Sequence, residues 1–148
     1  MRKLESNDLR ELGIFKHYRI VRRWACKNYN LKDADLELLI YFDCIGLFTR
    51  QDYIDGTYSY SWDKHRWERL VREGWIVIWR SRNKTTQKYN IYKTSYKCSQ
   101  LISRIYRILL GDEDLPESKK RNKIMLRDTY TDKVLSRAIK LINKDKNR

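Results

Sequence analysis

Basic and aromatic residues are concentrated between Tyr58 and Thr94, in the stretch YSYSWDKHRWERLVREGWIVIWRSRNKTTQKYNIYKT. Side chains of these types bind nucleic acids, because Arg and Lys donate hydrogen bonds to phosphates and to guanine edges. Residues 59–97 carry ten basic and three acidic side chains. The chemistry that this composition suggests is binding, and not the making or breaking of covalent bonds.

Groups suited to catalysis or metal binding are few. His17 and His65 are the only histidines, which disfavours a catalytic histidine or a His-based metal site. Cys26, Cys44 and Cys98 are odd in number and scattered, a pattern of neither a disulfide framework nor a zinc site. We expect all three to be small core residues in a reducing compartment. There is no Gly-rich phosphate loop and no carboxylate pair in a catalytic setting. The sequence therefore predicts a protein that is not an enzyme and has no cofactor or metal.

The overall charge indicates an acidic partner. The 148 residues are enough for one domain with a core, and their formal net charge is +14. Nucleic acid is the commonest partner of a small basic protein, although a generally solvated basic surface is the alternative. The positive charge lies in residues 1–30, 59–97 and 117–148, whereas residues 31–58 are acidic. No apolar run approaches the roughly 18 residues of a membrane span, and the N-terminus lacks the apolar segment of a signal peptide. A cytoplasmic, DNA-associated protein without membrane contact is expected.

Helical periodicity places two helices before the basic stretch. Residues 9–28 predict one helix, with the apolar stripe Phe15, Tyr18, Val21 and Ala25. Residues from 31 onward predict a second, with the buried stripe Leu36, Leu39, Ile40 and Cys44. Gly46 is expected to end this second helix, as glycine commonly does.

Two shorter helices are expected next. Thr49 and Asp52 have the spacing of a capping box, so a short helix should begin there and end at Gly56. After a turn, a further helix is expected over residues 61–73, ended by Gly74. Its core face is expected to be Trp67, Leu70 and Val71.

A hairpin and two long helices complete the prediction. The runs WIVIWRS and QKYNIYKT are rich in β-branched and aromatic residues, and the basic link between them predicts a β-hairpin. Thr94 is expected to cap a helix with the stripe Cys98, Leu101, Ile102, Ile105 and Leu109. A final helix is expected over residues 118–143, with the buried face Val134, Ala138, Leu141 and Ile142.

This order predicts a mainly α fold with a small β-hairpin wing, of the α+β class. A short helix after a turn, followed by a hairpin with a basic tip, is typical of a winged helix–turn–helix. The helix would fit the roughly 12 Å major groove, and the hairpin would reach phosphates or the minor groove.

Three segments resemble the MarR-type winged-helix transcription regulators: LKDADLELLIYF (31–42), RLVREGWI (69–76) and IYKTSYKC (91–98). The resemblance implies one winged-helix domain over 1–148, with a DNA-binding lobe at about 31–97. It also implies dimerisation helices at about 9–30 and 95–143, flanking that lobe. Such a protein is a homodimer that binds pseudo-palindromic double-stranded DNA and regulates transcription. A small-molecule effector would fit this family, but the sequence identifies none.

The expected DNA-binding residues lie off the predicted core stripe or on the wing. Lys64, His65 and Arg66 are expected near the start of the recognition helix, where one or two would contact bases. Arg82 and Lys84 are expected on the polar link, near phosphates or the minor groove. The full predicted set is Ser61, Lys64, His65, Arg66, Arg69, Arg80, Arg82 and Lys84. The alternative is that this set is a solvated polar face.

A different class of function fits the same features. The protein could be a structural, assembly or replication accessory protein of a phage or mobile element. Its winged helix would then bind a protein partner, or bind DNA without sequence preference. The sequence does not separate these possibilities.

Overall fold

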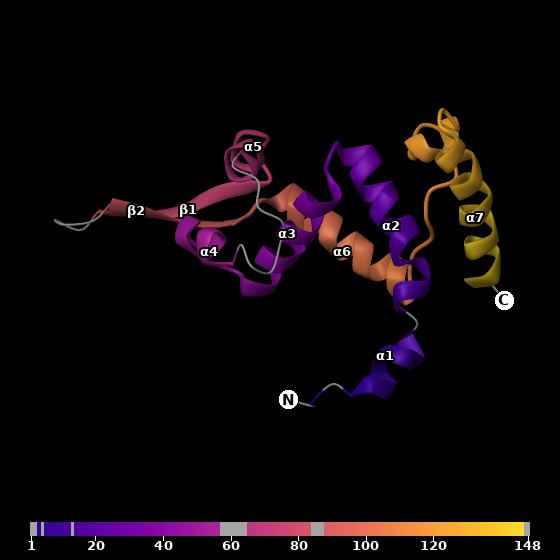
Figure 1. Ribbon diagram of the computed structural model, residues 1–148, viewed down its shortest axis with the longest axis horizontal. Coiled ribbons are helices and arrows are strands. Elements are labelled where there is room, and N and C mark those ends of the chain that lie inside the picture. Colours follow the sequence, from indigo (N-terminus) through magenta and orange to yellow (C-terminus); the bar gives the residue numbers. More distant parts are fainter. Residues whose placement is uncertain (1–2, 4, 13, 57–64, 84–87, 147–148) are drawn as a thin grey trace. The chain divides into compact units, whose positions relative to one another are not determined.

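The computed structural model describes residues 3, 5–12, 14–56, 65–83 and 88–146. Within these ranges the chain is mainly helical with one antiparallel β-hairpin, the fold class that the sequence predicts at this coarse level (Figure 1). The elements are α1 (Ser6–Leu12), α2 (Ile14–Tyr29), α3 (Asp33–Ile45), α4 (Arg50–Asp55), α5 (Arg66–Arg72), β1 (Ile76–Asn83), β2 (Lys88–Thr94), α6 (Tyr96–Leu110), the 3-10 helix η1 (Lys123–Leu126) and α7 (Tyr130–Lys146). The chain divides into two compact units, which we name the central unit (Lys32–Ile102) and the terminal unit (Met1–Leu31 and Ser103–Arg148).

The first predicted helix is two helices, α1 and α2. Gly13 separates them in the sequence, and glycine is among the weakest helix formers. Val21 and Ala25 of α2 are buried as predicted, but Phe15 is exposed. Trp24 is also buried, and it lies on the same helix face as Val21, three residues earlier in the sequence.

α3 is bounded at both ends by recognisable signals. The backbone N–H of Lys32 donates to the carboxylate of Asp35 at 3.1 Å, which begins the helix. Gly46 ends the helix with a φ of 93°, a backbone conformation that residues other than glycine rarely adopt. The predicted stop is therefore confirmed. The buried apolar residues are Leu36, Leu38, Leu39 and Phe42. Placing Ile40 and Cys44 in the buried stripe was wrong, because Ile40 is only half-buried and Cys44 is exposed.

The predicted capping box of α4 is confirmed. Thr49 Oγ1 accepts the N–H of Asp52 at 3.2 Å, and the N–H of Thr49 donates to the Asp52 carboxylate at 2.8 Å. The helix ends at Gly56. Just before it, Phe48 exchanges two backbone hydrogen bonds with Tyr92 of β2, at 3.1 and 2.8 Å. This bridge adds a single strand-like residue beside the hairpin.

β1 and β2 form the predicted hairpin, paired from Ile76↔Thr94 to Asn83↔Lys88. The first strand runs two residues beyond the predicted run WIVIWRS, because Arg82 and Asn83 also belong to β1 and pair with Tyr89 and Lys88 of β2. The register shifts between Ile78 and Arg80, where Trp79 is an extra residue and makes a β-bulge. Figure 1 shows the hairpin extending away from the helices of the central unit.

α6 begins at a different cap from the one predicted. Thr94 pairs within the hairpin, and the hydroxyl of Ser95 instead accepts the N–H of Cys98 at 3.3 Å. The predicted apolar stripe is otherwise confirmed at Cys98, Leu101, Ile102 and Ile105, all of which are buried. Ile108 is buried as well, whereas Leu109 is half-buried.

The single helix predicted over residues 118–143 was wrong, because the chain forms η1 and then α7. Asn122 is buried, and its side chain accepts the N–H of Ile124 at 3.1 Å, which starts the short η1. Arg127 then takes a left-handed backbone conformation with a φ of 56°, which ends η1. Thr129 starts α7 by accepting the N–H of Asp132 at 3.1 Å.

The buried face of α7 also differs from the prediction. Val134 and Leu141 are exposed, and Ala138 is half-buried. The buried residues of α7 are Asp132, Ser136, Ile139, Ile142 and Asn143. This face is partly polar, so an apolar stripe could not locate it. Across the described ranges, no helix has the length and apolar character that crossing a lipid bilayer requires.

Candidate nucleic-acid interface

An aromatic cluster around Trp67 holds α5 in the central unit. The Trp67 ring meets Phe42 of α3 and Phe48 edge-on, with both pairs of centroids 6.0 Å apart. It also lies 5.6 Å from Tyr53 of α4 and 4.9 Å from Tyr92 of β2. Edge-to-face pairs at these distances are favourable. The cluster therefore joins both helices and the hairpin to α5, and the prediction that Trp67 is a core residue is confirmed.

A buried charged centre ties α5 to the start of α3. Asp35 Oδ1 accepts from Arg66 Nε at 2.9 Å and from Arg69 Nη2 at 2.6 Å. The side chain of Asp35 is 2% exposed and that of Arg66 is 5% exposed. Because a buried charge is costly without its partner, this centre constrains the orientation of α5 relative to α3.

This geometry corrects the expectation that Arg66 contacts DNA bases. Its guanidinium is buried against Asp35, so it is not presented to a ligand outside the unit. Arg69 is also half-buried and bonded to Asp35. Both arginines position the helix. In the sequence each arginine is next to a core residue, Arg66 beside Trp67 and Arg69 beside Leu70. The one sequence signal for their partner is the acid Asp35 in the first turn of α3.

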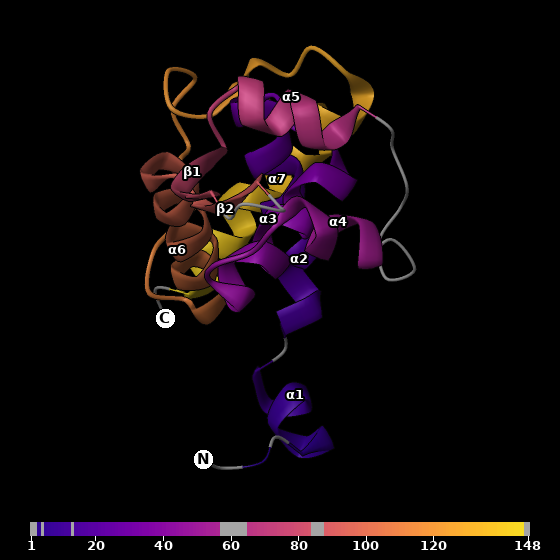
Figure 2. The same ribbon diagram turned by 90° about the vertical axis from the view of Figure 1, so that its left-hand side faces the viewer.

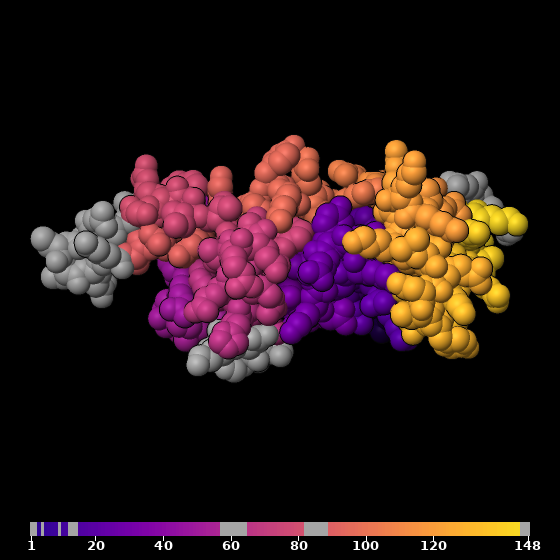
Figure 3. All heavy atoms as spheres, turned by 90° about the horizontal axis from the view of Figure 1, so that it is seen from above, coloured from indigo at the N-terminus to yellow at the C-terminus, as the bar shows by residue number. Residues whose placement is uncertain are grey.

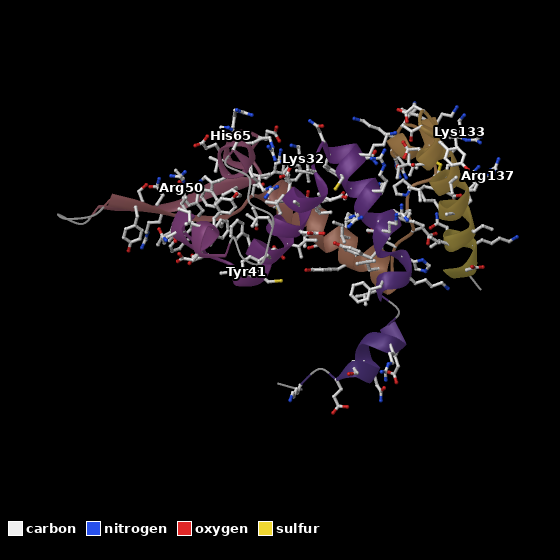
Figure 4. All side chains as sticks on the ribbon, in the orientation of Figure 1. Lys32, Tyr41, Arg50, His65, Lys133 and Arg137 are labelled. Carbon is white, nitrogen blue, oxygen red and sulfur yellow. The ribbon has the colours of Figure 1, made fainter. Side chains whose placement is uncertain are left out.

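α5 presents a second, exposed face. His65, at its N-terminal end, is 74% exposed, and its Nδ1 lies 4.0 Å from Glu68 Oε2 (Figure 4). Glu68 and Arg72 are exposed on the same helix. The formal charge of Glu68 offsets that of Arg72, so this face carries little net charge.

Lys97 of α6 fixes the C-terminal end of α5. Its ammonium donates to the carbonyl of Glu73 at 2.7 Å and lies 4.2 Å from the centroid of the Trp75 ring. A cation at a helix C-terminus is favourable because the last carbonyls there are unpaired. Gly74 makes the exit turn with a φ of 80°. The predicted glycine stop is confirmed, but the role of Lys97 was not visible in the sequence.

The hairpin carries exposed basic and apolar side chains. Figure 2, which looks along the hairpin, shows α5 on one side of its base and α4 on another. Arg80 is exposed, and its guanidinium lies 5.2 Å from the centroid of the Trp79 ring. Lys93 is exposed on the return strand. Ile78 and Trp79, at the bulge, are exposed on the same strand as Arg80.

Four of the predicted site residues lie wholly or partly outside the described part of the chain. Ser61, Lys64 and Lys84 lie outside the described residues, and Arg82 lies in β1 with its side chain outside the described part. Of the predicted set, the structure brings Arg66 and Arg69 together at Asp35. It places His65 and Arg80 on exposed parts of α5 and β1, where Figure 3 shows these two elements on one face of the central unit.

The terminal unit contains a second charged centre that sequence reasoning missed. Asp132 of α7 is buried and accepts hydrogen bonds from Arg23, at 3.2 and 3.3 Å, and from Lys27 of α2. Burial alone would raise the pKa of Asp132, but the hydrogen bonds from Arg23 and Lys27 outweigh it and lower the pKa to about 2. Lys27 also bonds Asp128 at 2.5 Å. This centre joins α2 to α7.

Comparison of the chain with protein-family models, curated proteins and solved structures found no match.

Proposed function

We propose that the central unit is a winged helix–turn–helix that binds double-stranded DNA, with α5 at the major groove and the hairpin as the wing. One observation carries the proposal: the order α3, strand-like bridge at Phe48, α4, α5, hairpin, in which Phe48 pairs with the return strand. Trp67 packs α5 against α4 and the hairpin, so the two candidate DNA-binding elements have a fixed relation to each other.

The charge of the chain supports a polyanionic partner. The net charge is +14, and residues 59–97 contribute ten basic against three acidic side chains. Duplex DNA binds such a surface because neutralised phosphates release their counterions.

The two elements would have different tasks. The exposed face of α5 has little net charge, so we assign base contacts to His65 and Arg72. Arg80 and Lys93 on the hairpin are exposed and have no acid beside them on their own strands, so we assign them phosphate contacts. Ser61, Lys64, Arg82 and Lys84 stay predicted contacts.

A selection from a pool of random duplexes tests the proposal. The full chain should enrich a pseudo-palindromic sequence, and His65→Ala or Arg72→Ala should relax the preference at a defined position of each half-site. A base contact by Arg is worth about 1–3 kcal/mol of discrimination. Arg19→Ala, which removes an exposed cation of α2, should leave the profile unchanged. Failure to retain any duplex would reject DNA binding.

We further propose that the protein acts as a homodimeric transcription regulator of the MarR type. Leu101, Ile105 and Ile142 lie on the apolar stripes of the predicted dimerisation helices, but they are buried within the chain and cannot form an interface. Exposed apolar residues on α7 support an interface instead: Tyr130, Val134 and Leu141 follow one another at spacings of four and seven, which places them on one helix face. Sedimentation at micromolar concentration should give a dimer, and a single 18.2 kDa species would exclude one.

One observation favours a second candidate, a winged helix that binds a protein. Ile78, Trp79 and Tyr89 are exposed on the hairpin, and exposed aromatic and apolar side chains are typical of the centres of protein interfaces. Under this candidate Trp79→Ala would abolish capture of the partner, and the random pool would yield no enriched sequence.

A further inference from the structure

The terminal unit contains a basic hollow between η1 and α7. Its volume is about 410 Å³, and its cationic lining residues are Lys119, Arg127, Arg137 and Lys140. All four are exposed. Glu117, Met125 and Leu126 also line it. Figure 3 shows the η1 and α7 segments, orange and yellow, packed side by side, and Figure 4 labels Arg137 on α7.

The four cations are not neutralised within the described part of the chain. No ion pair joins Lys119, Arg127, Arg137 or Lys140 to a carboxylate there. The acids at the start of α7 are already engaged, because Asp128 and Asp132 bind Lys27 and Arg23 of α2. Among the described residues that line the hollow, Glu117 is the one carboxylate, so the hollow carries a clear excess of positive charge.

The η1 wall of the hollow is held in place by buried hydrogen bonds. Asn122 Oδ1 accepts from Asn28 Nδ2 of α2 at 3.1 Å, and Asn122 Nδ2 donates to the carbonyl of Pro116 at 2.9 Å. Arg127 follows η1 directly and has a left-handed backbone conformation. Its N–H donates to the carbonyl of Ile124 at 3.1 Å.

A separate set of hydrogen bonds holds the α7 wall. Asp132 is anchored to α2 by Arg23 and Lys27, and the buried Ser136 donates to the carbonyl of Lys133 at 2.8 Å. Both walls are therefore tied to α2. A ligand entering this hollow would not have to order its walls, which lowers the cost of binding.

The lining points to a phosphorylated ligand with an apolar or aromatic part. Arg and Lys are the usual phosphate ligands, and Arg also stacks on planar rings. Met125 and Leu126 supply apolar surface beside the cations. The volume lies within the range of roughly 300–1,000 Å³ that is typical of small-molecule sites. We propose that the hollow binds a nucleoside diphosphate or triphosphate, with its phosphates on the four cations and its base against Met125 and Leu126.

Titration calorimetry of the full chain with ADP, pyrophosphate and adenosine tests the proposal. ADP should bind, pyrophosphate should compete with it, and adenosine should bind more weakly. The variant Arg137→Gln/Lys140→Gln should weaken ADP binding by at least about tenfold, since it removes two charged partners of the phosphates.

The chain offers a matched control on α2. Lys16→Gln/Arg19→Gln removes one Lys and one Arg three residues apart, both exposed and neither part of the hollow. ADP binding by this variant should stay within about twofold of the wild type. Equal losses in both double variants would overturn the proposal by showing non-specific attraction. Thermal melting checks that Arg137→Gln/Lys140→Gln, the hollow variant, is folded. If it is unfolded, Lys119→Gln takes its place, and a loss of ADP affinity is again expected.

A parallel titration with a random-sequence duplex separates the two sources of phosphate. If neither ADP nor pyrophosphate binds while the hollow variant loses affinity for the duplex, the hollow contacts a nucleic-acid backbone and the nucleotide proposal fails. The proposal is supported if the hollow variant loses ADP binding and its affinity for the duplex falls no more than that of the matched control.

Discussion

Arg66 Nε lies 2.9 Å from Asp35 Oδ1, and both side chains are buried. The pair links the first turn of α3 to the first turn of α5, across 31 residues of sequence. Arg69 adds a second bond to the same oxygen at 2.6 Å. The proposed DNA-binding helix is thus oriented by a carboxylate that itself belongs to the cap of another helix, through its bond from the Lys32 N–H.

Asp35→Ala should lower the free energy of unfolding by about 3–5 kcal/mol, because it leaves the Arg66 guanidinium buried without its partner. Denaturant unfolding followed by circular dichroism measures this loss. Asp114→Ala removes an exposed carboxylate after α6 and should change stability by about 0.5 kcal/mol or less. Similar losses in the two variants would show that the buried pair does not stabilise α5.

Trp67→Ala should destabilise the protein by about 3–5 kcal/mol, because Trp67 is the common partner of four other aromatic rings in the core. Trp79→Ala is the matched control, since Trp79 is exposed on the hairpin. Its cost should be about 1 kcal/mol or less. Urea unfolding of both variants decides, and the account is wrong if Trp79→Ala is the more damaging change.

The stability of the terminal unit should depend on pH, because folding changes the pKa of Asp132. Its pKa is about 2 in the folded chain and 3.8 is its ordinary value. Because folding lowers this pKa, the ionised carboxylate stabilises the folded state above about pH 4, and this contribution of about 2 kcal/mol is lost as the pH falls towards 2.

Asp132→Asn isolates this effect from other acids. Its stability deficit against the wild type, measured by urea unfolding, should be largest near neutral pH and should shrink between about pH 4 and pH 2. A deficit that stays constant over this window would contradict the assigned ion pairs with Arg23 and Lys27.

The three thiols should differ in reactivity. Burial raises the pKa of Cys98 to about 12, with a further contribution from the charge of Asp43, so Cys98 should hold almost no thiolate at neutral pH. Cys26 is buried, whereas Cys44 is exposed. A chromogenic thiol reagent should therefore modify one cysteine rapidly in the native protein, and Cys44→Ser should remove this fast phase. Retention of the fast phase in that variant would refute the assignment.

Local signals in the sequence predicted the elements whose ends depend on neighbouring residues. The Thr49–Asp52 capping box, the glycine stops at Gly46 and Gly74, and the hairpin all follow from short-range chemistry. The structure confirms these features. They could be predicted because they depend on neighbouring residues and on no distant contact.

Features that depend on distant partners were not predicted. Arg66 looked like a basic side chain off the apolar stripe, but its partner is Asp35 in another helix. The C-terminal helix was predicted too long because Asn122 bonds to Asn28 and Pro116, which a periodicity argument cannot detect. The buried face of α7 was misplaced because it includes Asp132, Ser136 and Asn143, which are polar residues satisfied by hydrogen bonds within the fold.

The central claim is that the hairpin and α5 form a DNA-binding surface. Fluorescence anisotropy with a labelled duplex, from about 50 to about 200 mM salt, tests it most directly. Arg80→Ala/Lys93→Ala should weaken binding to all duplexes and flatten the slope of log K against log salt by about 0.9 for each phosphate that the variant no longer neutralises. The matched Lys16→Ala/Arg19→Ala variant should keep the wild-type slope. A slope that is unchanged in the hairpin variant, or equally flattened in both, would show that the hairpin does not touch the DNA backbone and would contradict the account.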